Sequence, residues 1–184
     1  MSRLSCKHLI LEAAEAVVRD GGAAHLTLDA VADKAGVSKG GLLYHFPTKE
    51  ALIEGMIAQV IERGQERRAV ALEQLPATPS RGLKAEIISL LVTHDVDHRV
   101  STALLAAVAN EPKHTSRFRE LHRERFAAHT ENAPHPERVE IVLLAAYGLF
   151  FLDLLQGSPF DARQRAALVE ELLRLSEEAT LDRR

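Results

Sequence analysis

Two histidines in the run His94-Asp95-Val96-Asp97-His98 have the sharpest spacing for chemistry in this chain. Residues four apart lie on one face of a helix, so His94 and His98 have the spacing of two metal ligands. A protein-bound zinc ion needs further ligands, and the sequence places no fixed third ligand beside this pair. Histidines exposed at a helix end explain the pattern without a metal. We therefore predict no metal site and no cofactor.

Other serines, histidines and acids do not stand in patterns typical of catalysis. No nucleophile elbow, phosphate-binding loop or Cys-x-x-Cys motif surrounds them. Asp153 lies between Leu152 and Leu154 in an apolar stretch, where an unpaired charge is costly. No second acid stands at a catalytic spacing from it, and a hydrogen bond at a subunit contact or at an exposed helix edge accounts for it. We therefore predict that the protein is not an enzyme.

The segment 26–52 has the pattern of two short helices joined by a tight turn. Thr27 and Ser38 are residues of the type that caps a helix start. Gly36 between them allows the left-handed backbone that ends a helix, and Pro47 stops the second helix. Two short helices with a glycine-containing turn form a helix-turn-helix, whose second helix enters the major groove of DNA. The sequence thus predicts a DNA-binding protein.

The start of the second helix, Ser38-Lys39-Gly40-Gly41, is suited to close approach to DNA. Glycine is about 1 kcal/mol less favourable than alanine within a helix, so two glycines here indicate a backbone near a surface. An ordinary glycine-rich turn is the alternative for this pair alone. Backbone N–H groups at a helix start attract phosphate, and Lys39 adds a mobile positive charge. The residues that we predict to contact DNA are Thr27, Ser38, Lys39, Gly40, Gly41, Tyr44, His45, Thr48 and Lys49.

This segment resembles the DNA-binding domain of the tetracycline-repressor (TetR) family of bacterial regulators. The family's motif runs from a Thr-Leu pair through A-G-V-S-x-G-x-[LI]-Y-x-[HY]-F to Lys-Glu-x-Leu. The chain departs from the family at Gly41, where a hydroxyl residue is frequent, and at Leu43, where an aromatic residue is common. The resemblance implies a C-terminal helical domain that binds an effector, forms a dimer and acts on the DNA-binding heads through the fourth helix. The matching residues are Thr27, Leu28, Ala35, Gly36, Val37, Ser38, Gly40, Leu42, Tyr44, Phe46, Lys49, Glu50 and Leu52.

Composition agrees with this resemblance. The 184 residues are 46% hydrophobic but only 4% aromatic, with abundant Ala, Leu and Glu, which is typical of packed helices. The net charge of −3 argues against sequence-blind coating of nucleic acid, so DNA affinity must come from where the charges lie. The single Cys6, with no leader and no apolar run of about 20 residues, predicts a soluble cytoplasmic protein.

Apolar residues at helical spacing predict an all-α protein of about nine helices. We expect a three-helix helix-turn-helix DNA-binding domain over residues 1–48 and a helical ligand-binding and dimerisation domain over residues 49–184. The fourth helix is expected from Thr48 to about Glu73, and the fifth over Gly82–Asp97. A final helix capped by Asp161 is expected to end near Glu178.

The last two long helices favour self-association. The run Leu144–Leu149 places small residues among large ones, which allows helices to approach closely. The resemblance implies that both helices pair with their copies in a twofold dimer, and symmetric dimers are common among helix-turn-helix proteins. A monomer whose core these helices complete is the alternative. The predicted dimer residues are Leu144, Ala145, Gly148, Leu149, Leu152, Leu168, Leu172 and Leu175.

The resemblance also implies an effector site, and few aromatic residues with many alanines favour a cavity in the C-terminal helices. Apolar stripes of this kind are more often plain core. We expect a small, largely apolar organic effector oriented by one or two polar groups among His94, Asn110, His122, Tyr147 and Asp153. The predicted ligand-binding residues are Met56, Val60, Leu91, His94, Leu104, Val108, Phe118, His122, Tyr147 and Phe151.

The function predicted from the sequence is a ligand-responsive transcriptional regulator, acting as a repressor that a small molecule releases from a palindromic operator. Its predicted partners are double-stranded operator DNA, a small-molecule effector and a second copy of the chain, with no membrane. The alternative is a helical protein-interaction module that keeps the helix-turn-helix but does not bind DNA.

Overall fold

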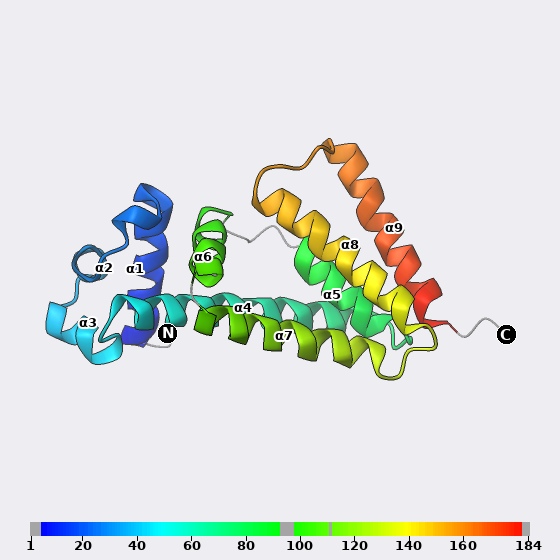
Figure 1. The fold of residues 1–184 in the computed structure, drawn as a ribbon, viewed down its shortest axis with the longest axis horizontal. Coiled ribbons are helices and arrows are strands. Elements are labelled where there is room, and N and C mark those ends of the chain that lie inside the picture. Colours follow the sequence, from blue (N-terminus) through cyan, green and yellow to red (C-terminus); the bar gives the residue numbers. More distant parts are fainter. Residues whose placement is uncertain (1–4, 93–97, 111, 182–184) are drawn as a thin grey trace. The chain divides into compact units, whose positions relative to one another are not determined.

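The computed structural model of the chain describes residues 5–92, 98–110 and 112–181 (Figure 1). Throughout these ranges the regular structure is helical and contains no strand, which confirms the predicted all-α class. None of the described helices has an apolar stretch long enough to cross a bilayer. The elements are α1 (Cys6–Gly21), the 3-10 turn η1 (Ala23–His25), α2 (Leu28–Ala35), α3 (Lys39–His45), α4 (Lys49–Gln74), α5 (Arg81–Leu91), α6 (His98–Asn110), α7 (Pro112–Thr130), α8 (Pro136–Leu154) and α9 (Ala162–Thr180).

Side-chain caps set several of the helix starts. The hydroxyls of Thr27, Ser38 and Thr48 each accept a hydrogen bond of 3.1 Å from the backbone N–H three residues later. Asp161 and Gln164 form a reciprocal capping box at the start of α9. The α-helix of α5 ends at Leu91, before the expected end at residue 97, and residues 93–97 lie outside the described ranges.

The chain packs as two compact units. The N-terminal unit comprises residues 1–62 and 97–115, and the C-terminal unit comprises residues 63–96 and 116–184. Helix α4 contributes residues to both, and α6 belongs to the N-terminal unit although it comes late in the chain. The predicted functional division after residue 48 remains a prediction, because these units are defined by packing.

Helices α1, α2, α3 and α6, with the first part of α4, share the core of the N-terminal unit. Ile10, Val31, Leu42 and Leu52 are fully buried there. Helix α4 passes very close to its neighbours at Gly55, where an added Cβ would lie 2.6 Å from Cε1 of Phe46. Within α3 itself only Leu42 is buried, so this helix is held in the core of the unit by one face.

The core of the C-terminal unit lies between α5, α8 and α9. Helices α8 and α9 run antiparallel and are joined by a short loop (Figure 1). Arg165 in α9 joins the three helices, because its Nε donates to Asp153 at 2.7 Å and its Nη2 donates to the carbonyl of Leu91 at 2.8 Å. An ion pair within the unit thus accounts for Asp153.

Candidate DNA-binding surface and buried polar cluster

Helices α2 and α3 form the predicted helix-turn-helix. Gly36 ends α2 in the left-handed region, with φ of 66°, and its N–H donates to the carbonyl of Asp33. Val37 then donates from its N–H to the carbonyl of Ala32, which closes the turn. Leu42 is fully buried, so the opposite face of α3 points to solvent. Local backbone chemistry and one buried face thus position the recognition helix.

The residues predicted to contact DNA lie at the surface or close to it. Tyr44 is the clearest example, because 84% of this aromatic residue is exposed. Its ring packs edge-on against His45, with ring centroids 5.1 Å apart. An exposed Tyr beside a His offers two groups that can hydrogen-bond phosphate oxygens. Thr27, Ser38, Lys39, Gly40, Thr48 and Lys49 are exposed as well, and Gly41 and His45 are half-buried.

The two glycines of α3 differ in their surroundings. A Cβ on Gly40 would meet no heavy atom within 4 Å, whereas a Cβ on Gly41 would lie 3.3 Å from Oγ of the capping Ser38. Neither glycine has a positive φ. The fold therefore requires no glycine at residue 40.

The lysines of this surface are not equivalent. Lys39 pairs with Asp29 at 2.8 Å, and Lys34 pairs with Asp20 at 2.9 Å. The hydrogen bond and charge of Lys34 hold the pKa of Asp20 below its ordinary value. Within the described part of the chain, the ammonium of Lys49 has no ion-pair partner, so this lysine is the one most available to a phosphate.

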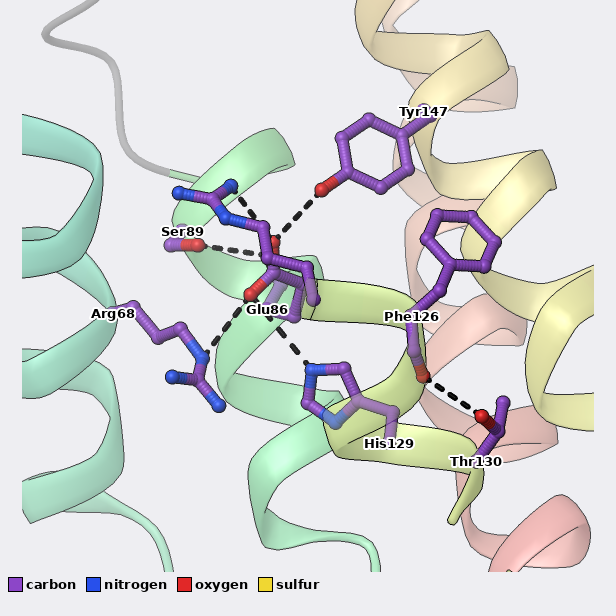
Figure 2. Close-up of polar contacts among 8 residues, drawn as sticks. Arg68, Glu86, Ser89, Phe126, His129, Thr130 and Tyr147 are labelled. Atoms are coloured by element: carbon purple, nitrogen blue, oxygen red, sulfur yellow. Dashed lines mark hydrogen bonds and ion pairs between the residues drawn. The ribbon is translucent and has the colours of Figure 1, made fainter. Parts of the chain in front are cut away.

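A polar cluster lies buried in the C-terminal unit around Glu86, which is only 1% exposed (Figure 2). Its carboxylate lies 3.1 Å from Nε of Arg68 and 3.2 Å from Nη1 of Arg125. The hydroxyl of Tyr147 donates to the same carboxylate at 3.1 Å, and Nε2 of His129 lies 3.9 Å away. The cluster thus joins α4, α5, α7 and α8 through one acid.

The partners of Glu86 decide its charge. Burial alone would raise the pKa of this carboxyl, but contact with His129, the charges of Arg125 and Arg68 and the Tyr147 hydroxyl outweigh burial and lower it. Burial and the charge of Glu86 in turn raise the pKa of Tyr147 to about 12. The site therefore contains a charged carboxylate and a neutral phenol that donates to it.

The sequence reasoning predicted Tyr147 but missed Glu86 and its cationic partners. A signal was present, because Glu86 lies close to Leu83 and Ile87 in an apolar helix, as Asp153 does in α8. The Tyr147 ring also packs against His122, with centroids 5.1 Å apart, and is stacked on Phe126 at 6.0 Å. Two of the predicted ligand-binding residues, Tyr147 and His122, are thus brought together.

The other predicted ligand-binding residues fall into separate groups. Met56, Val60 and Leu104 belong to the core of the N-terminal unit. Leu91 and Phe151 belong to the core cluster of the C-terminal unit. His94 and the side chains of Val108, Asn110 and Phe118 lie outside the part of the chain that the structure describes. Among the described residues, no three His, Cys, Asp or Glu side chains gather as a metal site would require.

The predicted dimer residues divide into exposed and buried sets. Leu144 is 61% exposed, and Ile141 beside it is 65% exposed. A Cβ on Gly148 would meet no atom of the chain within 4 Å. Leu149 and Leu172, in contrast, are buried in the core of the unit. The exposed apolar residues follow helical spacing along α8, and others lie just after α8 and on α9. They are Ile141, Leu144, Ala145, Leu152, Leu155 and Leu168. Leu175 on α9 is half-buried.

Two parts of the chain match known families. Residues 10–56 match the family described as bacterial regulatory proteins, tetR family, and residues 81–177 match the tetracyclin repressor-like C-terminal domain. The HTH-type transcriptional regulator EthR from Mycolicibacterium smegmatis is 31% identical to this chain over 78 residues. That match covers 42% of this chain and 36% of the length of the relative.

Solved structures share the whole fold. A TetR transcription regulator from Haloarcula marismortui has a TM-score of 0.74 at 18% identity, over 96% of this chain and 98% of its own. A transcriptional regulator from Rhodococcus sp. RHA1 has a TM-score of 0.71 at 18% identity, and a Saccharomonospora viridis protein crystallised with choline has 0.71 at 16% identity; each covers 96% of this chain and 98% of its own. The C-terminal family match alone spans more than half of the chain. The chain therefore belongs to the TetR family of bacterial regulatory proteins.

Proposed function

We propose that this protein is a DNA-binding transcriptional repressor that a small molecule releases from a palindromic operator. The observation that carries the proposal is Gly40, an unobstructed glycine in the first turn of a capped helix-turn-helix recognition helix. A glycine in this place costs helix stability and gains nothing within the chain. Family membership supports the same role, and the relative EthR is named as a transcriptional regulator.

In the proposed complex, α3 lies in the major groove with Lys39 near base edges. Tyr44, His45 and Lys49 hold phosphates on either side, and the capped starts of α2, α3 and α4 direct backbone N–H groups toward them. A dimer presents two such helices to successive grooves of a palindrome. We propose no catalytic role, and such a regulator would act in the bacterial cytoplasm, where its operator lies.

The test of DNA binding is Gly40→Ala. The variant should fold at least as stably as wild type, because alanine is about 1 kcal/mol more favourable in a helix and the added methyl meets nothing in the chain. Its affinity for the operator should fall about tenfold or more, because the methyl group enters the helix–groove contact in both half-sites. Affinity is measured by fluorescence anisotropy on a palindrome enriched by the wild-type protein from a randomised duplex pool.

Lys49→Ala provides the comparison for that experiment. It should weaken binding to every sequence alike and lower the salt slope by about 1. Unchanged operator binding by Gly40→Ala would show that α3 does not approach DNA as proposed. A wild-type protein that enriches no sequence would instead favour the alternative of a protein-interaction module.

The proposed effector is a small organic molecule held by the C-terminal unit near Tyr147, His122 and Phe151. The Saccharomonospora viridis protein of the same fold was crystallised with choline, which supports binding of a small molecule by a protein of this fold. A ligand at about 100 times its dissociation constant should add about 2.7 kcal/mol of stability. Thermal unfolding against a metabolite library detects this shift, and a true effector must also lower operator affinity. A compound that stabilises the protein without affecting operator binding would contradict the release mechanism.

A further inference from the structure

We infer that Asp29 is a specificity-determining residue. It positions the ammonium of Lys39 over the DNA groove and prevents this ammonium from pairing with phosphates of DNA of random sequence. The inference rests on the proposed DNA-binding function and adds a role for an acid on the DNA-binding surface. In the N-terminal unit Lys and Arg do not outnumber Asp and Glu, and the inference explains how such a unit favours one DNA sequence over others.

The contact joins the two helices of the motif at the surface. Asp29 lies in the first turn of α2, and Lys39 is the first residue of α3. Oδ1 of Asp29 is 2.8 Å from Nζ of Lys39, and the two side chains are 68% and 61% exposed. Exposed ion pairs contribute little to stability, and buried Val31 and Leu42 already hold the two helices in the core. Stability therefore does not explain the pair.

The pair has a clear consequence for DNA recognition. A lysine ammonium has three N–H donors, so Lys39 can keep one on Asp29 and direct the others to a base edge. A tethered ammonium cannot swing freely to the nearest phosphate, which weakens binding to random DNA. A matched base in the groove still finds a positioned donor, so the tether favours the matched sequence.

The other charged residues of this surface also divide into lysines held by an acid and a lysine that is available to phosphate. Lys34 on the same motif is held by Asp20 in a similar ion pair of 2.9 Å. Lys49 has no ion pair among the described residues, so its ammonium is available to bind a DNA phosphate. Asp33 supplies a control, because it is exposed on α2 one turn after Asp29 and makes no side-chain ion pair within the described ranges.

The experiment compares Asp29→Asn, Asp29→Glu and Asp33→Asn with wild type. Dissociation constants are measured from about 50 to about 200 mM salt for the enriched palindrome and for a random duplex of equal length. Asp29→Asn should bind random DNA about threefold more tightly per half-site, or about tenfold for a dimer, because the released Lys39 ammonium can approach a phosphate and two unit charges about 6 Å apart in water attract with about this strength. Its salt slope on random DNA should increase, and its preference for the palindrome should fall about tenfold.

Asp29→Glu keeps the charge and should retain most of the wild-type preference. Asp33→Asn should strengthen binding to both duplexes equally and leave the preference unchanged. Lys39→Gln breaks the same ion pair from the other side, and it should weaken palindrome binding without strengthening binding to random DNA. Thermal unfolding of each variant verifies that it is folded.

The inference is overturned if Asp29→Asn keeps the wild-type preference, or if Asp33→Asn reduces that preference as strongly. Either result, obtained while wild type still selects its palindrome, leaves the proposed DNA-binding function in place. A wild-type protein that selects no sequence removes both.

Discussion

Glu86→Gln should destabilise the protein by about 2 to 3 kcal/mol, which corresponds to a thermal midpoint about 5 to 10 °C lower. The amide keeps the size of the side chain but removes the negative charge that faces Arg68 and Arg125 in this buried site. The NH2 of the amide also carries a partial positive charge, which the two arginines repel. Removing one partner of a buried ion pair typically costs about 3 to 5 kcal/mol. The two arginine side chains are 35% and 23% exposed, so water reduces that cost.

The pH dependence of this effect gives a second measurement. The pKa of Glu86 is lower in the folded protein than the ordinary value of 4.5, so its stabilising contribution is fully present above that value. As the pH falls below about 4.5 toward the folded-state pKa, the carboxylate is protonated and the contribution is lost. The difference in unfolding free energy between wild type and Glu86→Gln should therefore be constant near neutral pH and shrink in acid.

Glu171→Gln is the matched control for Glu86→Gln. Glu171 pairs with Arg174 one turn along α9 at the surface, where solvent screens the interaction. Its replacement should leave the thermal midpoint essentially unchanged. Equal midpoints for wild type and Glu86→Gln would contradict the view that the buried carboxylate compensates the arginines around it.

Gly148→Leu should convert the proposed dimer to a monomer at micromolar concentration. A Cβ at this position meets no atom of its own chain within 4 Å, and leucine is about 1 kcal/mol more favourable than glycine in a helix, so the monomer should still fold. Overpacking at a close helix contact costs about 1 to 3 kcal/mol, and a twofold interface contains the residue twice. The dimer dissociation constant should rise about thirtyfold or more, and palindrome binding should weaken with it.

Sedimentation velocity over a concentration series measures the change. Ala128→Leu is the control, because it also introduces a leucine at an exposed helical position, but on α7 rather than on α8 or α9. It should leave the dimer intact. A wild-type chain that sediments as a monomer at micromolar concentration would remove the dimer, and with it the proposed binding to two half-sites.

Much of the helix-turn-helix could be predicted from the sequence, because its geometry depends on short-range chemistry. The caps at Thr27 and Ser38 act on N–H groups three residues away, and the left-handed Gly36 needs only its own backbone freedom. The all-α class and the long α4 followed from apolar spacing for the same reason.

The faces of α8 were beyond this reasoning. Apolar residues surround much of that helix, so their spacing did not separate Leu149, which is buried, from Leu144, which is exposed. The structure separates them because α5 and α9 cover one side of α8. The proposed dimer surface is accordingly centred on Leu144 and Gly148.

By itself, the sequence determined the helices, their caps and the recognition motif, since each rests on contacts between residues a few positions apart. Only the tertiary structure decided that Glu86 meets Arg68 and Arg125, that Lys39 is held by Asp29, and that α6 joins the N-terminal unit. The physical reason is that these contacts join different helices, and which helix faces meet depends on how all the apolar surfaces are buried together.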